Sequence, residues 1–222
     1  MNPLRLSVEV ALVESALALA RLLPRRALLA VGGAVGAFAG RIDRRHAAVA
    51  RDNLRAAYGD ALTAKKRERV LRRCWRHFGR ITFDALAFAK LDHNALGSVL
   101  EVEGLDNLHE AIARGRGVLV FSAHYGHWEA GAYAMGLIGI RSAVIARPLD
   151  NPVLDRRLAQ LRGGSGNSVI SKRRAVRETM RALAHGTSVA ILIDQDAGAD
   201  GVFVPFFGRL ASTTPTLALL AL

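Results

Sequence analysis

The segment FSAHYGHWE, residues 121–129, combines residue types that move protons. It places His124 five positions before Glu129, where an apolar run gives way to a polar one. A neutral histidine takes a proton from a hydroxyl group, and a nearby carboxylate orients the ring and stabilises the resulting cation. The spacing fits a His–Glu dyad for general-base catalysis. It fits equally well a histidine that caps a turn and a glutamate favoured by the positive end of a helix.

A metal site is an alternative use of the same segment, because His124, His127 and Glu129 are all possible ligands. Two histidines three residues apart match metal sites only loosely, and no further His/Asp cluster completes a recognisable site. The single cysteine, Cys74, excludes an internal disulfide and a zinc site built from several cysteines. We therefore expect no metal and no bound cofactor.

The region from about residue 100 onward alternates between strand and helix patterns. Apolar, β-branched runs predict strands at 117–123, 141–146, 168–171 and 188–193, and helical patterns between them predict helices at 127–139, 152–162 and 173–185. This order predicts an α/β fold, a layered αβα domain with a mostly parallel sheet.

Polar residues follow several of these strands. In open α/β sheets, ligands gather at the carboxyl ends of the strands, which is where His124, Arg147, Asp194 and Asp196 fall. An arginine at such an edge can bind a phosphate or a carboxylate through two hydrogen bonds, or it can form an ion pair with a neighbouring aspartate. The aromatic segment 201–208 (GVFVPFFG) is expected to form either a wall of an acyl pocket or an ordinary core loop.

The N-terminal part of the chain differs sharply from the rest. Residues 1–90 contain 18 Lys/Arg and 7 Asp/Glu, whereas residues 91–222 contain 13 and 12. Apolar helices are predicted at 4–23 and 27–40, and the second carries Gly32, Gly36 and Gly40 on one face, which permits close helix contact. A basic amphipathic stretch follows at 41–60, and Thr63 is expected to cap the next helix.

These features predict a helical, membrane-associating region at 1–90 ahead of an α/β domain at 91–222. An apolar and basic arm favours an anionic membrane surface as partner. No zinc finger, RNA-recognition signature or aromatic–basic alternation suggests nucleic acid. The chain ends in an apolar helical pattern without a stop signal, so we expect it to be truncated at the C-terminus.

Taken together, the ordered motifs resemble a known family. SAHYGHWE, RPLDNPVLD, LRGGSGNSVI, DQDAG, GVFVPFFG and ASTTPTLALLA follow one another as in the bacterial lipid A late (lauroyl/myristoyl) acyltransferases, members of the wider glycerolipid acyltransferase group marked by H-x-x-x-x-D/E. The resemblance covers about four-fifths of the chain. His127 departs from the asparagine that many members carry at this position.

The resemblance implies direct acyl transfer without an acyl-enzyme. His124 would deprotonate an acceptor hydroxyl, which attacks the thioester of an acyl carrier protein or of coenzyme A, and Glu129 would orient the histidine. The residues implied to contact the substrates are Arg147, Asn151, Arg162, Asp194 and Asp196. The acceptor would be a membrane lipid, a lipid A-like precursor or a related glycolipid, and the enzyme would lie at the cytoplasmic face of the inner membrane.

Three alternatives remain open at the level of sequence. The same dyad acting on water would give an acyl-thioester or lipid hydrolase. Relatives in the family acylate phosphatidylinositol mannosides, so the acceptor is not fixed by the motif. A truncated chain could also be an inactive lipid-binding protein.

Overall fold

The computed structural model describes residues 3–88, 94 and 97–222. Contacts between residues divide the chain into two compact units. The α/β unit comprises Met1–Glu14, Phe88–Gly201 and Thr213–Leu222, and the helical unit comprises Ser15–Ala87 and Val202–Ser212. The predicted boundary between residues 90 and 91 lies outside the described residues.

The centre of the α/β unit is a parallel sheet of four strands. The strands are β1 (Leu119–Ser122), β2 (Ser142–Ala146), β3 (Ser168–Ser171) and β4 (Ser188–Leu192), and their order across the sheet is β1-β4-β2-β3. All three pairings between neighbouring strands are parallel. Short, mostly apolar strands of this kind suit a sheet covered on its faces by helices. The predicted α/β class and parallel sheet are therefore confirmed.

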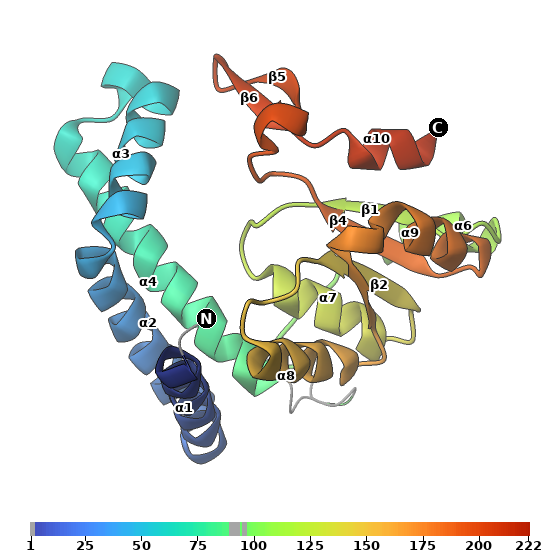
Figure 1. The fold of residues 1–222 in the computed structure, drawn as a ribbon, viewed down its shortest axis with the longest axis horizontal. Helices are drawn as coiled ribbons and strands as arrows, with labels where there is room; N and C mark the ends of the chain where they lie inside the picture. The colour runs from blue at the N-terminus through green and yellow to red at the C-terminus, as the bar shows by residue number, and fades with distance from the viewer. Residues whose placement is uncertain (1–2, 89–93, 95–96) are drawn as a thin grey trace. The chain divides into compact units, whose positions relative to one another are not determined.

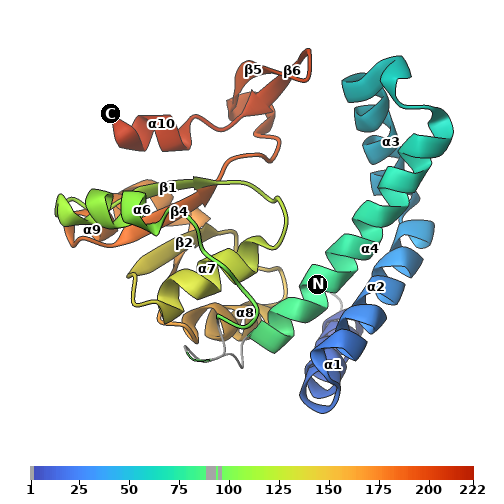
Figure 2. The ribbon, with the colours of Figure 1, turned by 180° about the vertical axis from the view of Figure 1, so that it is seen from behind.

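Helices lie on both sides of this sheet (Figures 1 and 2). α7 (Trp128–Leu137) and α8 (Pro152–Gly163) lie on one side, and α10 (Thr216–Ala221) lies on the other. The α/β unit also contains α6 (Leu105–Ala113) and α9 (Ala175–Ala184). The sheet core contains Ala143, Ile170, Val189 and Ile191, and α9 and α10 contribute partly buried side chains that pack against it.

The turn between β1 and α7 depends on a glycine. Gly126 adopts a φ of +61°, in the left-handed region that a side chain disfavours. It lies two residues after His124, and α7 begins at Trp128. The chain therefore leaves the sheet edge, turns sharply and enters a helix within a few residues, which keeps His124 at the edge and puts Glu129 in the first turn of α7.

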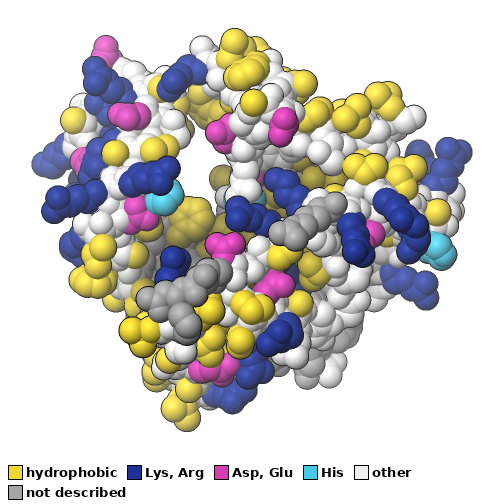
Figure 3. All heavy atoms as spheres, viewed as in Figure 1, with side chains coloured by type: hydrophobic (Ala, Val, Ile, Leu, Met, Phe, Trp, Pro, Cys, Tyr) yellow, Lys and Arg dark blue, Asp and Glu magenta, His cyan; other side chains and the backbone are white. Residues whose placement is uncertain are grey.

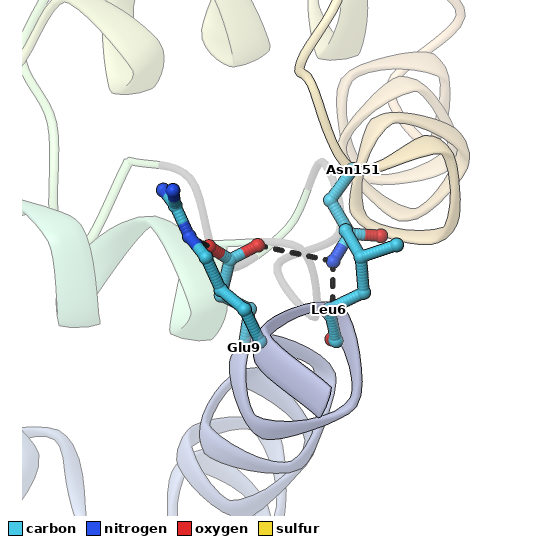
Figure 4. Close-up of polar contacts among 4 residues, drawn as sticks. Leu6, Glu9 and Asn151 are labelled. Atoms are coloured by element: carbon cyan, nitrogen blue, oxygen red, sulfur yellow. Dashed lines mark hydrogen bonds and ion pairs between the residues drawn. The ribbon is translucent and has the colours of Figure 1, made fainter. Parts of the chain in front are cut away.

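Asn151 joins two segments of the α/β unit that are far apart in sequence (Figure 4). Its Oδ1 accepts hydrogen bonds from the backbone N–H groups of Val153 at 3.1 Å and Leu154 at 3.5 Å, and so caps α8. Its Nδ2 donates to the carbonyl oxygen of Leu6 and to Oε2 of Glu9, both at 3.2 Å, in α1 (Pro3–Leu22). The residue is only 3% exposed.

The prediction that Asn151 contacts substrate stays a prediction, and the structure gives the residue a role within the protein. Both polar atoms of its amide are used inside the protein, so the residue anchors α1 rather than presenting a free amide to a ligand. Its hydrogen bond to Glu9, together with that of Arg5, lowers the pKa of the Glu9 carboxyl. A second contact between the same helices joins Arg157 to Glu14 at 3.0 Å.

Replacing Asn151 is expected to destabilise the α/β unit. Asn151→Ala removes the cap of α8 and leaves the polar groups of α1 without their partner, which should cost about 1–2 kcal/mol. Asn151→Asp keeps the cap of α8 but places a second carboxylate beside Glu9. Its stability should therefore lie between that of wild type and that of Asn151→Ala. Chemical denaturation measures both, with Asp150→Ala, at an exposed neighbour, as control. Equal stability of Asn151→Ala and Asp150→Ala would contradict the anchoring role.

The helical unit is built on α2 (Arg25–Ile42), α3 (Arg44–Tyr58) and α4 (Ala64–Phe88). Gly36 and Gly79 bring the backbones of α2 and α4 into direct contact, because a Cβ on either glycine would overlap the other helix. Gly32 and Gly40 also lie against α4, at Phe83 and Trp75. The predicted close contact through these glycines is confirmed. Thr63 caps α4 as expected, since its Oγ1 accepts a hydrogen bond from the N–H of Lys66 at 3.3 Å.

Two short strands, β5 (Val202–Phe206) and β6 (Arg209–Thr213), form a hairpin that belongs to the helical unit. Its turn contains Phe207 and Gly208, both with positive φ, as two-residue hairpin turns require. Phe207 contacts the ring of Tyr58 at a centroid distance of 5.8 Å. The phenylalanines of this hairpin are more than half exposed. The expectation of a core loop at 201–208 is therefore wrong.

The described helices include none long and apolar enough to cross a membrane.

The contact between α2 and α4 predicts that a Gly→Ala substitution in α2 lowers stability, whereas such a substitution in a helix usually raises it. Alanine in place of an open helical glycine normally stabilises by about 0.5–1 kcal/mol. At Gly36 the added methyl group meets the backbone of α4, so Gly36→Ala should destabilise the helical unit by about 1–3 kcal/mol. Hydrogen exchange of α2 and α4 measures the effect. Gly131→Ala in α7, where a Cβ would meet nothing within 4 Å, is the control and should not destabilise.

Candidate active site

A large cleft opens in the α/β unit, at the carboxyl ends of the strands. Its volume is about 1940 Å³. Residues along β1, β2 and β4 line it, together with α6, α7 and the start of α9. Five predicted site residues are among the lining residues: His124, Glu129, Arg147, Arg162 and Asp196.

His124 is held by Asp194 through two hydrogen bonds. The ring Nδ1 lies 2.8 Å from Oδ1 of Asp194, and the backbone N–H of His124 donates to Oδ2 of the same carboxylate at 2.8 Å. Trp128 packs edge-on against the imidazole at a centroid distance of 5.1 Å. The ring is therefore fixed by one carboxylate and one aromatic neighbour, and its side chain is 31% exposed.

The register of the sheet explains this contact. β1 and β4 are neighbours, and Ser122 lies opposite Leu192. His124 and Asp194 each follow this pair by two residues, so they leave adjacent strands at the same level. Neighbouring strands are about 4.8 Å apart, a separation that a histidine and an aspartate can bridge.

The same contact sets the charge of Asp194. Burial opposes its ionisation, but the hydrogen bonds from the ring and the backbone N–H of His124 outweigh burial and lower the pKa of the carboxyl. An ionised Asp194 accepts a hydrogen bond from the Nδ1–H group, and this leaves the lone pair of the imidazole on Nε2. In this tautomer, Nε2 of His124 is the nitrogen that can accept a proton.

Glu129 has a different partner from the one predicted. Its carboxylate forms two hydrogen bonds with the guanidinium of Arg162, at 3.0 Å and 2.5 Å. Among the described contacts none joins Glu129 to His124. The carboxylate beside the ring is thus Asp194, which follows β4, and not Glu129 as expected. The catalytic roles of His124 and Glu129 stay predictions.

The Glu129–Arg162 pair is itself part of the cleft. Both side chains are largely buried, with 26% and 22% exposed. A two-point contact between a guanidinium and a carboxylate fixes the plane of the arginine. Arg162 comes from the last turn of α8 and Glu129 from the first turn of α7, so the pair also ties the two helices together.

His127 caps α7. Its Nδ1 accepts a hydrogen bond from the N–H of Ala130 at 3.2 Å and so caps the helix. Its ring packs against Phe88 at a centroid distance of 5.2 Å. Within the described residues no group of His, Cys, Asp and Glu is arranged to hold a metal ion.

The other predicted residues are placed less tightly. Arg147 follows β2 and lies 3.5 Å from Asp150, with both side chains largely exposed. Asp196 accepts a hydrogen bond from the N–H of Gly198 at 3.0 Å. The hairpin residues 202–212 belong to the helical unit, so the expectation that this aromatic segment walls an acyl pocket stays a prediction.

Three cations that sequence reasoning passed over also line the cleft: Lys172, Arg174 and Arg177. They follow β3 directly, at the same edge as His124. The signal was present in the sequence, because the predicted strand at 168–171 is followed at once by a basic run.

Comparison with known proteins adds to this geometry. The family model described as bacterial lipid A biosynthesis acyltransferase matches residues 4–222. The chain is 31% identical over 201 residues to the lipid A biosynthesis palmitoleoyltransferase of Escherichia coli, and 27% identical over 204 residues to its lipid A biosynthesis lauroyltransferase. Each match covers 89% of this chain and 64% of the relative.

A relative with another acceptor also matches. The phosphatidylinositol mannoside acyltransferase of Mycolicibacterium smegmatis is 28% identical over 137 residues, which are 60% of this chain and 45% of that protein. The chain thus spans less than two thirds of the length of these relatives. Because the family model covers nearly the whole sequence, the chain belongs to the bacterial lipid A biosynthesis acyltransferase family.

Proposed function

We propose that the protein is an O-acyltransferase that moves a fatty acyl chain from a thioester to a hydroxyl group of a lipid A-like precursor or a related glycolipid. The observation that carries the proposal is that His124, which Asp194 holds by hydrogen bonds, lines a large cleft of the α/β unit. An oriented imidazole beside a large open cleft suits the deprotonation of a bulky acceptor. Family membership supplies the class of reaction.

The reaction follows from the orientation of the ring. Nε2 of His124 removes the proton of the acceptor hydroxyl as its oxygen attacks the thioester carbonyl, and Asp194 stabilises the imidazolium that forms. The tetrahedral intermediate then collapses, the carbon–sulfur bond breaks, and the proton on Nε2 passes to the sulfur. The products are an ester and a free thiol, and no acyl-enzyme is formed.

Glu129 acts in this proposal through Arg162. Its carboxylate fixes the guanidinium in the wall of the cleft, where Arg162 contacts the acceptor or the developing negative charge. Arg147 and Asp196 lie along the same cleft and complete the proposed substrate contacts. No metal or cofactor takes part in the proposed steps.

A second acceptor class remains a candidate because of one relative. The similarity to a phosphatidylinositol mannoside acyltransferase favours a mannosylated phospholipid as the alternative to a lipid A-like precursor. Both are glycolipids with hydroxyl groups, so the proposed chemistry at His124 is the same for either.

The charge of the helical unit supports binding to an anionic membrane surface. We propose that this surface is the cytoplasmic face of the inner membrane. The helical unit holds 17 Lys/Arg against 5 Asp/Glu, whereas the α/β unit holds 14 of each. Figure 3 shows Lys and Arg side chains gathered over α3 and α4. Exposed apolar side chains of the same unit follow helical spacing along α2, at Val35, Phe38 and Ile42. Basic charge beside apolar surface suits an anionic lipid surface, and the same charge suits an acidic acyl carrier protein as donor.

Membrane binding should depend on the charge of the helical unit. Replacing Arg69, Arg72 and Arg73 of α4 by Gln should weaken binding to vesicles of phosphatidylglycerol and phosphatidylethanolamine by about two orders of magnitude at low salt, at about 1 kcal/mol per charge. Replacing Arg114, Arg116 and Arg141 of the α/β unit changes the net charge equally and is the control. Co-sedimentation measures both, and an equal loss in the two variants would refute a role specific to the helical unit.

Acyl transfer itself tests the site. His124→Ala should lower kcat by at least about a hundredfold, because the general base is lost. Asp194→Asn should lower kcat by about a hundredfold or more and change the pH profile of kcat, because the amide no longer fixes the tautomer. Glu129→Gln should lower the rate while leaving that pH profile unchanged. His109→Ala, on the exposed side of α6, should behave as wild type.

The assay uses a labelled acyl carrier protein with and without glycolipid acceptor. Product ester that appears only with acceptor supports the transferase. Release of fatty acid at the same rate without acceptor would identify a hydrolase instead. If the 222-residue chain shows neither activity but a C-terminally extended form is active, residues beyond this chain are needed. Full activity of His124→Ala and Asp194→Asn would sink the proposed mechanism.

A further inference from the structure

We propose that Ser165 and Asn167 are positioning residues that hold Arg162 at the cleft by binding the loop after α8 to α7. The inference rests on the proposed acyl transfer, to which it adds two residues that act through the Glu129–Arg162 pair. Neither of the two is among the described residues that line the cleft, so a contact with substrate does not explain them.

The segment that joins α8 to β3 is buried, although its sequence suits an exposed turn. Residues 163–167 read GGSGN, and segments rich in glycine usually form turns at the protein surface. Ser165 and Asn167 are nevertheless each only 7% exposed. Because polar side chains at this depth are normally hydrogen-bonded, their partners show what the loop is attached to.

Three hydrogen bonds connect α7 to the backbone of Arg162 through this loop. Nδ2 of Asn167 donates to the carbonyl oxygen of Ala132 in α7 at 2.6 Å and to Oγ of Ser165 at 3.0 Å. Oγ of Ser165 donates to the carbonyl oxygen of Arg162 at 3.4 Å. The amide of Asn167 therefore joins the helix that carries Glu129 to the end of the helix that carries Arg162.

The backbones of α7 and the loop are also in direct contact, at Gly136. A Cβ on Gly136 would overlap the backbone and Oγ of Ser165, so no side chain fits between them. Glycine inside a helix costs stability relative to alanine. Its presence in α7 is explained by a contact that leaves no space for a methyl group.

These contacts lie on the face of α7 that carries Glu129. Glu129, Ala132 and Gly136 are spaced by three and four residues, so they lie on one side of the helix. α7 and α8 lie side by side (Figures 1 and 2). The Glu129–Arg162 pair is the end of this contact that lies in the cleft, and the loop is its buried end.

The position of the Arg162 side chain depends on its backbone. Arg162 lies in the last turn of α8, where helices fray unless their carbonyl oxygens find partners. A partly exposed ion pair gains little from charge alone, because two long side chains lose freedom when they pair. The pair with Glu129 is therefore ordered only while the loop holds the end of α8 against α7.

Asn167 is not the best residue for stability at its position. Its Oδ1 is buried, and the described part of the chain offers it no hydrogen-bond partner. A buried carbonyl oxygen without a donor costs free energy, which offsets part of the gain from the two hydrogen bonds that Nδ2 donates. Asn167→Ala should therefore lower Tm by only about 2–4 °C, so that unfolding does not account for a large loss of activity well below Tm.

The test is a double-mutant cycle in the acyl-transfer assay with the 222-residue protein. Asn167→Ala should lower kcat/KM at least about tenfold, because a small displacement of a positioned group lowers the rate strongly. In Arg162→Ala protein the same substitution should change kcat/KM by less than about twofold, because the group that it positions is already absent. Asn167→Ala should also change the same parameter, kcat or KM, that Arg162→Ala changes, and should leave the pH profile set by His124 unchanged.

A second variant and a control complete the cycle. Ser165→Ala removes the hydrogen bond to the backbone of Arg162 and should give a smaller loss of the same kind, about two- to fivefold. Thr179→Ala, at a fully buried position of α9, removes buried volume away from the loop, so Tm should fall while kcat and KM stay unchanged. Full additivity of Asn167→Ala and Arg162→Ala would overturn the positioning role. Wild-type-like kinetics in both loop variants, or an equal kinetic loss in Thr179→Ala, would overturn it as well.

A measurement without turnover separates this inference from the proposed function. In isotope-labelled protein, the NMR signal of the Nε–H group of Arg162, assigned by its loss in Arg162→Lys, reports the hydrogen bond to Glu129. Asn167→Ala should speed the exchange of this proton with water at least about tenfold. The Nε–H group of Arg25, which donates to Asp84 in the helical unit, is the control and should not change. Faster exchange at Arg162 alone supports the positioning role even if no acyl transfer is detected, and unchanged exchange at Arg162 would reject it even if transfer occurs.

Discussion

The parallel pairing of β1 with β4 is the constraint on which the site depends. It sets Ser122 opposite Leu192, and so brings His124 and Asp194 out of the sheet side by side. The carboxylate then binds both the ring and the backbone N–H of the same histidine, which fixes the imidazole relative to the main chain. The turn at Gly126 then leads into α7, whose start is capped by His127 and whose first residue, Trp128, packs against the imidazole. A shift of register by one residue would turn one of the two side chains to the other face.

Much of the α/β unit could be predicted from the sequence because its strands and helices have strong local patterns. The strands at 142–146, 168–171 and 188–192 fall within one or two residues of the expected ranges, and apolar runs between turn signals explain why. The carboxyl edge of the sheet could be predicted as the site for the same reason. The hairpin at 202–213 could not, because its exposed phenylalanines resemble a core segment in every local property.

The partner of His124 was beyond sequence reasoning for a geometric reason. Glu129 is close along the chain, and Asp194 is seventy positions away. Only the strand order reveals that β4, the last strand of the sheet in sequence, lies beside β1. Asn151 illustrates the opposite difficulty: its type and position suit a ligand contact, but both polar atoms are used to cap α8 and to hold α1.

The attachment of α1 has a consequence for how this protein can be shortened. Leu6, Glu9 and Glu14 contact α8, so the first turns of this apolar helix are part of the α/β unit. Deleting the apolar N-terminus to improve solubility would remove the groups that Asn151 and Arg157 bind, and would loosen the helix that carries Arg162. Solubilising substitutions on the exposed stripe at Leu4, Val8 and Leu12 leave those contacts in place, and are the sounder route to a protein that can be handled without detergent.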